Sequence, residues 1–211
     1  MTIKRRLTVG ACTLISAACC GSLSAEPMTF ADQAAFTAAL PALPQVLDFD
    51  HMAAGTTIED AMTTGGITFS YDFEGLAMKV AHLYATTSSP NFLGTVDGGM
   101  FHDGDDFTLT FEPGNGIGLF FISADPLVDG DIKVTAGGAT ASLVALQVQE
   151  TLPDGSRVYF LGVVDTEVPI TQARVEALPG GFFLYNVDDI MTAPVDATSV
   201  ASNEAADTDA F

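Results

Sequence analysis

The most informative absences in this 211-residue chain are those of cysteine, tryptophan and basic side chains. All three cysteines lie before residue 21, and tryptophan does not occur at all. Beyond residue 25 there is therefore no thiol for a disulfide, for nucleophilic catalysis or for a metal site. The folded part of the chain must be stabilised by a hydrophobic core, by bound ions, or by both.

Basic residues are equally scarce in the remainder of the chain. Residues 26–211 carry 27 acidic side chains and only 4 basic ones, a formal net charge of −23. Proteins bind nucleic acids mainly through lysines and arginines that neutralise phosphates, and four scattered cations cannot form such a surface. The composition therefore excludes a nucleic-acid partner, and the same charge excludes attraction to an anionic membrane surface.

The first 25 residues differ from the rest in both charge and hydropathy. Lys4, Arg5 and Arg6 precede an apolar run over residues 7–20, and small residues follow at 22–25. This order is typical of a secretory signal peptide, which we predict over residues 1–25. The apolar run is too short for a stable membrane-spanning helix, so no membrane span is expected. The mature protein is then secreted or periplasmic.

Residues 26–192 have the pattern of a single all-β domain. One amphipathic helix is predicted over residues 28–40, with Thr29 or Asp32 as its N-cap and Pro41 ending it. After it, β-forming residues alternate with Gly-Gly, Asp-Gly and Pro-Gly turns. We predict a two-sheet antiparallel sandwich, or jelly roll, with strands at 45–51, 66–73, 78–85, 106–112, 117–124, 131–136, 141–149, 157–164, 170–178 and 182–191.

The acidic tail over residues 193–211 has almost no large apolar side chain. Such a segment buries too little surface to offset the entropy lost on ordering, and we predict that it is disordered.

Several short motifs resemble those of a known family. They lie at residues 29–36, 47–50, 54–57, 66–70, 160–163, 168–170 and 187–190. In this order they resemble secreted bacterial β-sandwich proteins of the PEP-CTERM-associated type. The resemblance implies an extracellular jelly-roll domain, similar in shape to carbohydrate-binding modules and usually without a known enzymatic activity. The given sequence ends at Phe211 without the C-terminal anchor of such proteins, so we expect release into the medium or retention in the periplasm.

Two pairs of acidic residues stand at the ends of the first and last predicted strands of the domain. These are Asp48 with Asp50, and Asp188 with Asp189. First and last strands are often neighbours in jelly rolls, and Ca²⁺ takes six to eight oxygen ligands. The sequence predicts a structural calcium site formed by Asp48 or Asp50 with Asp188 or Asp189; the alternative is that these acids are solvated strand-end residues.

Two further acidic groups occur in predicted loops. Asp103, Asp105 and Asp106 lie in a glycine-rich loop and form a second candidate calcium cluster, for which a solvated loop is the alternative interpretation. Residues 125, 129 and 131 form a third group of aspartates, which we interpret as turn-forming residues.

Signals for catalysis are weak. The three histidines are widely spaced, neither His-x-His nor His-Glu-x-x-His occurs, and no Gly-x-Ser-x-Gly motif is present. No catalytic residue is predicted, although the many carboxylates leave open a glycosidase on the same fold. For sugar binding, the remaining candidates are the tyrosines and two asparagines: Tyr71, Tyr84, Tyr159, Tyr185, Asn91 and Asn115.

Together these observations favour an exported, acidic β-sandwich that serves as a binding or extracellular-matrix module. We expect calcium to stabilise it, and an extracellular glycan or matrix component is the candidate partner. The alternatives are a secreted polysaccharide-active enzyme on a jelly-roll fold and a purely structural surface protein.

Overall fold

A computed structural model describes residues 25–195, so the predicted signal peptide and most of the predicted tail, residues 196–211, lie outside the described residues. The helix is α1 (Gln33–Ala39). The strands are β1 (Met28–Phe30), β2 (Gln45–Leu47), β3 (Thr57–Ile58), β4 (Thr63–Thr64), β5 (Ile67–Tyr71), β6 (Met78–Ala81), β7 (Phe92–Thr95), β8 (Phe101–His102), β9 (Phe107–Ser123), β10 (Ile132–Ala136), β11 (Ala139–Ser142), β12 (Glu150–Thr151), β13 (Arg157–Val164), β14 (Ile170–Ala177) and β15 (Leu184–Pro194).

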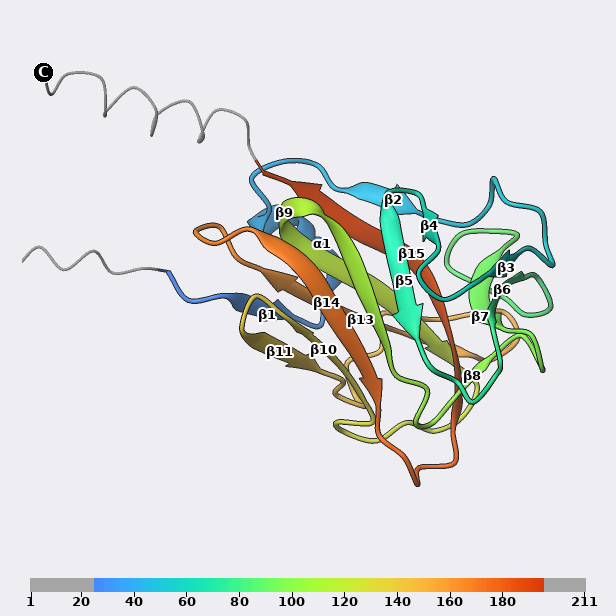
Figure 1. The fold of residues 1–211 in the computed structure, drawn as a ribbon. Helices are drawn as coiled ribbons and strands as arrows, with labels where there is room; N and C mark the ends of the chain where they lie inside the picture. The colour runs from blue at the N-terminus through green and yellow to red at the C-terminus, as the bar shows by residue number, and fades with distance from the viewer. Residues whose placement is uncertain (1–24, 196–211) are drawn as a thin grey trace, which may run out of the picture.

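The strands form an antiparallel β-sandwich whose two layers share strand β9 (Figure 1). The first half of β9 pairs with β5 and β14, and its second half pairs with β13 and β15. The large core cluster contains side chains from both groups of strands, such as Phe69 and Val175 with Leu161 and Val187. The predicted all-β sandwich with one short helix is therefore confirmed for the described residues.

The long strand β9 corrects the prediction of two strands separated by a turn at Pro113-Gly114. The chain continues through this point because Gly114 pairs with both Ile170 and Pro194, and the register shifts on either side accommodate the bend. An added Cβ at Gly114 would lie 2.3 Å from the carbonyl oxygen of Ala193. Pro113-Gly114 thus lies inside β9, at a point where β15 passes very close to it, and does not form a hairpin turn.

Several other predicted strands are shorter in the structure, among them β6, which ends at Ala81 and not at residue 85. β2 ends at Leu47, because Phe49 takes a left-handed conformation with φ of 60° and breaks the alternation predicted for residues 45–51. β11 ends at Ser142, and residues 143–149 form a loop. At the C-terminal end, β15 extends to Pro194, two residues into the segment predicted to be disordered.

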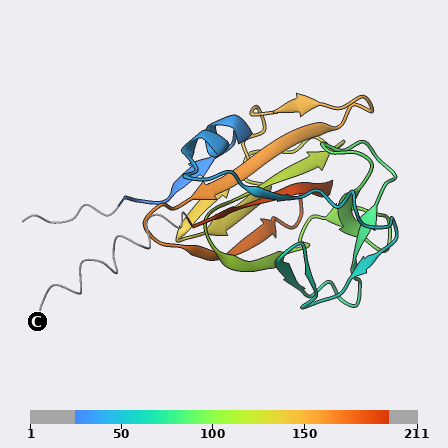
Figure 2. The ribbon, with the colours of Figure 1, turned by 90° about the horizontal axis from the view of Figure 1, so that it is seen from above.

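Helix α1 is shorter than predicted because residues 28–30 form β1, which pairs with β13. Asp32 is the N-cap, and its side chain accepts a hydrogen bond of 2.7 Å from the Ala35 N–H. The helix lies on the outer side of β13 (Figure 2). Its buried Phe36 packs over Gly118 and Gly162, which are paired across β9 and β13.

The close approach of Phe36 makes Gly162 a sensitive position. A Cβ there would lie 2.6 Å from Phe36 Cδ2 and 2.9 Å from Phe160 Cε1, so both rings would have to shift. We expect Gly162→Ala to lower the free energy of unfolding by about 1–3 kcal/mol, measured by urea denaturation. Gly98→Ala is the matched control, because a Cβ at Gly98 meets nothing within 4 Å and should leave stability nearly unchanged. Equal midpoints for the two variants would contradict this packing.

Among residues 25–195, the single helix is far too short to cross a membrane.

Candidate functional site

The structure brings together all four aspartates of the first candidate calcium site, but Asp188 and Asp189 lie in the middle of β15 and not at a strand end as predicted. β2 pairs antiparallel with β15, with Leu47 opposite Ile190, so the chain continues from this pair to Asp48 on one side and to Asp189 and Asp188 on the other. Asp50 lies just beyond β2. We call the group of Asp48, Asp50, Asp188 and Asp189 the acidic rim.

Two unusual backbone conformations shape the acidic rim. Phe49 has φ of 60° and Asp189 has φ of 46°, both in the left-handed region that non-glycine residues rarely adopt. The pairing of β15 with β9 also shifts register between Asp188 and Met191, which marks a β-bulge. As a result, the acidic side chains do not follow the simple alternation of an extended strand.

Asp188 is fully buried and is held by the loop between β6 and β7. Its Oδ2 accepts hydrogen bonds from the hydroxyl of Thr86, from the hydroxyl of Thr87 at 2.9 Å and from the backbone N–H of Ser88 at 3.0 Å. The Ser88 hydroxyl also lies 3.1 Å from this oxygen. Asp188 therefore anchors residues 86–88 to strand β15.

Burial and neighbouring negative charges raise the pKa values of two carboxyl groups of the acidic rim. Burial, followed by the negative charge of Asp189, raises the pKa of Asp188 to about 7, against the opposing effect of the donors on residues 86–88. Burial also raises the pKa of Asp189, and the charges of Asp48 and Asp50 add to that increase. Asp188 is thus affected by the charge of Asp189, and Asp189 by the charges of Asp48 and Asp50.

Asp48 and Asp50 each use one carboxylate oxygen to organise the backbone. Asp48 Oδ1 accepts from the Asp50 N–H at 3.1 Å, and Asp50 Oδ1 accepts from the Asn91 N–H at 2.8 Å. The Asn91 amide donates to the carbonyls of Phe49 and Met52. The second oxygens of Asp48 and Asp50 accept no hydrogen bond from residues 25–195.

No cation of the protein neutralises the rim within the described residues, where the ion pairs join only His102 to Asp97 and Arg174 to Asp106 and Glu176. In the same part of the chain, no three His, Cys, Asp or Glu side chains are gathered in a geometry that would hold a metal ion. The reason is visible at Asp188, whose carboxylate is turned towards residues 86–88. The rim thus brings the predicted residues together without gathering their oxygens at one point.

The anchoring role of Asp188 gives a direct prediction. Asp188→Ala removes the acceptor for Thr86, Thr87 and the Ser88 N–H, leaving donors at a buried position without partners. We expect a loss of about 2–4 kcal/mol in the free energy of unfolding, measured by urea denaturation. Asp72→Ala is the control, since Asp72 is exposed and anchors no such loop; equal losses in the two variants would contradict the anchoring role.

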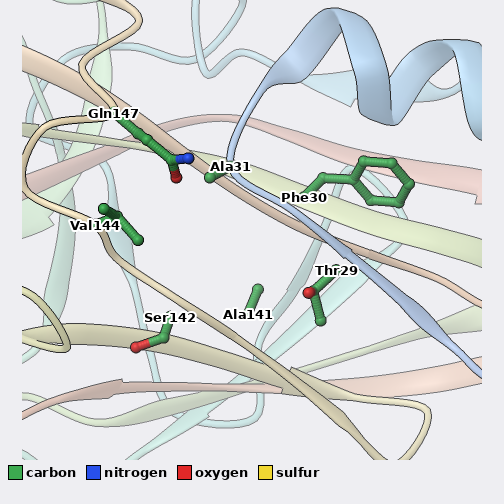
Figure 3. A pocket seen from close by; sticks show the side chains of 7 residues that line it. All are labelled: Thr29, Phe30, Ala31, Ala141, Ser142, Val144 and Gln147. Carbon is green, nitrogen blue, oxygen red and sulfur yellow. The ribbon is translucent and has the colours of Figure 1, made fainter.

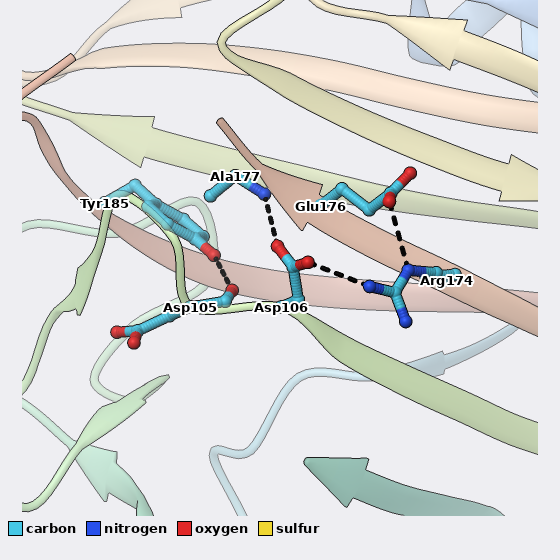
Figure 4. Close-up of polar contacts among 6 residues, drawn as sticks. All are labelled: Asp105, Asp106, Arg174, Glu176, Ala177 and Tyr185. Atoms are coloured by element: carbon cyan, nitrogen blue, oxygen red, sulfur yellow. Dashed lines mark hydrogen bonds and ion pairs between the residues drawn. The ribbon is translucent and has the colours of Figure 1, made fainter. Parts of the chain in front are cut away.

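The second candidate cluster does not converge. Asp106 accepts from Arg174 Nη2 at 2.9 Å and from the Ala177 N–H at 3.1 Å, while the carboxylate of Asp105 points away from it (Figure 4). Asp105 Oδ2 instead accepts from the His102 N–H at 2.7 Å. Both carboxylates therefore have hydrogen-bond partners within the protein and do not point towards a common ion.

Asp103, the third member of that cluster, organises the loop before β15. Its Oδ2 accepts from the N–H groups of Gly180 at 2.7 Å and Phe182 at 3.2 Å. Desolvation opposes ionisation, but these N–H groups together lower the pKa of Asp103 below its ordinary value. The loop presents Phe182, which is 90% exposed and has a left-handed φ of 54°.

The remaining predicted residues have structural surroundings. Asp125, Asp129 and Asp131 each accept a hydrogen bond from a backbone N–H, as expected of residues that shape turns and loops. The three histidines are all exposed. Of the four tyrosines, Tyr159 and Tyr185 are buried, Tyr71 is partly buried, and Tyr84 is 42% exposed.

A concavity of about 240 Å³ lies between β1 and β11 (Figure 3). Its walls are Thr29 to Ala31 on one side and Ala141, Ser142, Val144 and Gln147 on the other. None of these side chains is titratable, and Gln147 carries the only amide group. This surface has no group suited to acid, base or metal chemistry.

Sequence reasoning missed the polar partners of the acidic rim. Thr86, Thr87 and Ser88 hold Asp188, and the buried Asn91 holds the turn after Asp50. The only local signal is the run of hydroxyl residues at 86–89 followed by proline, which also fits an ordinary solvated loop. Its link to Asp188, about 100 residues away, exists only in the folded structure.

Comparisons with known proteins give limited similarity. No family model matches the sequence, and no curated protein matches it. Among solved structures, the K2 cleaved adhesin domain of Lys-gingipain matches with a TM-score of 0.45 and 11% identity, covering 71% of this chain and 97% of that chain. The arabinose-bound MgGH51 α-L-arabinofuranosidase matches with a TM-score of 0.32 and 15% identity, covering 70% of this chain and 27% of that one. At these TM-scores, neither similarity assigns an activity to this chain.

Proposed function

We propose that this protein is an exported, non-enzymatic binding or extracellular-matrix module whose acidic rim is stabilised by calcium. The observation that carries the proposal is the meeting of four aspartates from the two ends of the domain with no basic side chain beside them among the described residues. Such a concentration of negative charge is unfavourable unless some groups are protonated or a cation binds.

The atoms at the rim suit a hard cation. The second oxygens of Asp48 and Asp50, the carboxylate of Asp189 and the hydroxyl groups of Thr87 and Ser88 are all oxygen donors, and nitrogen or sulfur ligands are absent from this set. Binding requires the carboxylates to rotate towards a common point. Because the ion would link the start and the end of the domain, it would stabilise the whole sandwich.

Export and extracellular binding rest on sequence features. The basic and apolar pattern of residues 1–25, the absence of cysteine afterwards and the resemblance to secreted PEP-CTERM-associated proteins all support an extracellular or periplasmic protein. An extracellular glycan or matrix component is the proposed partner.

A glycan array combined with a hydrolysis assay tests the function. The purified protein should bind a subset of immobilised glycans and release no reducing sugar from the same polysaccharides. Release that disappears in a variant lacking one carboxylate pair would establish the polysaccharide-active enzyme instead. If the protein binds no glycan on the array and releases no reducing sugar, glycan binding is contradicted and a purely structural surface protein is the remaining interpretation.

A further inference from the structure

A small cavity beside the acidic rim contains a buried amide without a partner. Its volume is about 130 Å³, and its walls include Tyr84, Ile122, Asp125, Ser156, Leu184 and Asn186. Asn186 is 3% exposed, and its Oδ1 has no hydrogen-bond partner among residues 25–195. Buried polar groups in folded proteins are nearly always paired, so the enclosed and unpaired Oδ1 of Asn186 is an exception beside this cavity.

The other walls combine one aromatic face with apolar and polar groups. Tyr84 is 42% exposed, and its ring stacks on the buried Phe92 with centroids 6.1 Å apart and an interplanar angle of 29°. Ile122 and Leu184 supply apolar surface. Asp125 uses Oδ2 to accept from the Leu184 N–H at 2.8 Å, which leaves its other oxygen uncommitted among the described residues.

The aromatic wall is held in place before any ligand arrives. The Ala85 N–H, next to Tyr84, donates to Asp154 Oδ2 at 3.2 Å, which ties this loop to the turn between β12 and β13. Two residues further on, Thr87 is bound to Asp188. Preorganisation of this kind lowers the ordering cost of binding.

We propose that this cavity is a subsite for one neutral sugar ring of an extracellular glycan. A pyranose has an apolar face that packs on a tyrosine ring and hydroxyl groups that can pair with Asn186, Ser156 and Asp125. The volume is below the range of about 300–1,000 Å³ typical of sites for drug-sized ligands, so the cavity admits a single ring-sized group. This inference rests on the proposed function, because it names the part of the module that contacts a glycan.

The charge of the site selects against acidic sugars. The only ionisable groups on the cavity walls are the carboxyl of Asp125 and the phenol of Tyr84, and no lysine, arginine or histidine lines it. The net charge of residues 26–211 is strongly negative. Uronic and sialic acids would therefore be repelled, whereas neutral hexoses would not.

The test is an amide chemical-shift titration of the ¹⁵N-labelled protein with methyl β-D-glucopyranoside, methyl β-D-galactopyranoside, methyl α-D-mannopyranoside and glucuronate. We expect one of the neutral glycosides to bind with an affinity of about 1 mM and to shift the amides of Ala85, Asp125, Ser156 and Asn186. Glucuronate should cause no saturable shift. Tyr84→Ala should weaken binding about tenfold or more, and Tyr84→Phe should keep most of it.

Two variants separate a binding role from a structural one. Asn186→Ala should weaken sugar binding while leaving the melting temperature nearly unchanged, because Asn186 Oδ1 has no hydrogen-bond partner among the described residues that the substitution could remove. Phe182→Ala removes another exposed aromatic ring and should leave sugar affinity unchanged. Saturable binding that is lost in Phe182→Ala but kept in Tyr84→Ala would overturn the subsite while leaving glycan binding intact. Absence of shifts with every glycoside would also overturn the subsite, and the glycan array then decides separately whether glycan binding itself fails.

Discussion

Chelation of calcium is expected to lower the melting temperature of the protein by about 5–10 °C. An ion bound only by the folded state stabilises it by mass action, by about 2.7 kcal/mol when the free ion is at one hundred times its dissociation constant. For a domain of this size, 1 kcal/mol corresponds to about 2–4 °C. Differential scanning calorimetry in excess calcium and in excess chelator measures the difference.

The matched variant for this experiment is Asp50→Asn combined with Asp189→Asn. These substitutions remove two proposed ligands but leave the loop anchored to Asp188. The double variant should melt at the same temperature with calcium and with chelator. If the double variant is stabilised by calcium as much as the wild-type protein, the ion binds elsewhere. If the wild-type protein melts at the same temperature with calcium and with chelator, calcium does not stabilise it.

Without calcium, stability is expected to fall as the pH rises from about 4 to 7. Burial and Asp189 raise the pKa of Asp188 from its ordinary value of 3.8 to about 7, so the folded state binds a proton more tightly than the unfolded state does. The stabilising contribution is fully present below pH 3.8 and is lost as the pH rises through about 7. The loss amounts to at most about 4 kcal/mol, and urea denaturation at several pH values measures it.

Calcium should weaken this pH dependence. A bound cation favours the ionised carboxylates, so the fall in stability between pH 4 and 7 should become smaller with calcium present. The difference between the two pH profiles isolates the rim, because carboxylates elsewhere, such as Asp103, affect both profiles equally. Profiles that run parallel with and without calcium would contradict coupling between the ion and Asp188.

The acidic rim and the proposed sugar subsite share one loop and one strand. Asn186 and Asp188 lie two residues apart on β15, and the loop between β6 and β7 contacts both sites through Tyr84 and Thr86. Loosening of this loop would displace the aromatic wall of the cavity. If both proposals hold, a stable rim is a condition for a preorganised sugar site.

The sequence predicts the general fold well because it depends on local patterns. β13 lies at the predicted residues, and β14 and β5 lie within their predicted ranges, since alternation and flanking turn residues define them. Leu119, Phe121 and Ile122 are all buried, so β9 is covered on both faces at this point. Asp32 caps the helix, as one of the two predicted candidates.

The failures have tertiary causes. Pro113-Gly114 reads as a turn, but in the structure it lies inside β9 where two neighbouring strands cross closely. The left-handed conformation of Phe49 is disfavoured by its residue type, and aspartate adopts this conformation too rarely for the sequence to predict it at Asp189. For the same reason, the sequence indicates that the four aspartates meet but not where their carboxylates point.

A crystal structure from calcium-containing buffer, with anomalous diffraction data, tests the central claim most directly. The account predicts one anomalous peak between β2 and β15, with oxygens of Asp48, Asp50 or Asp189 at about 2.3–2.6 Å from it. A map with no such peak, and with Asp188 hydrogen-bonded to residues 86–88 as its only partners, would contradict a calcium-stabilised rim.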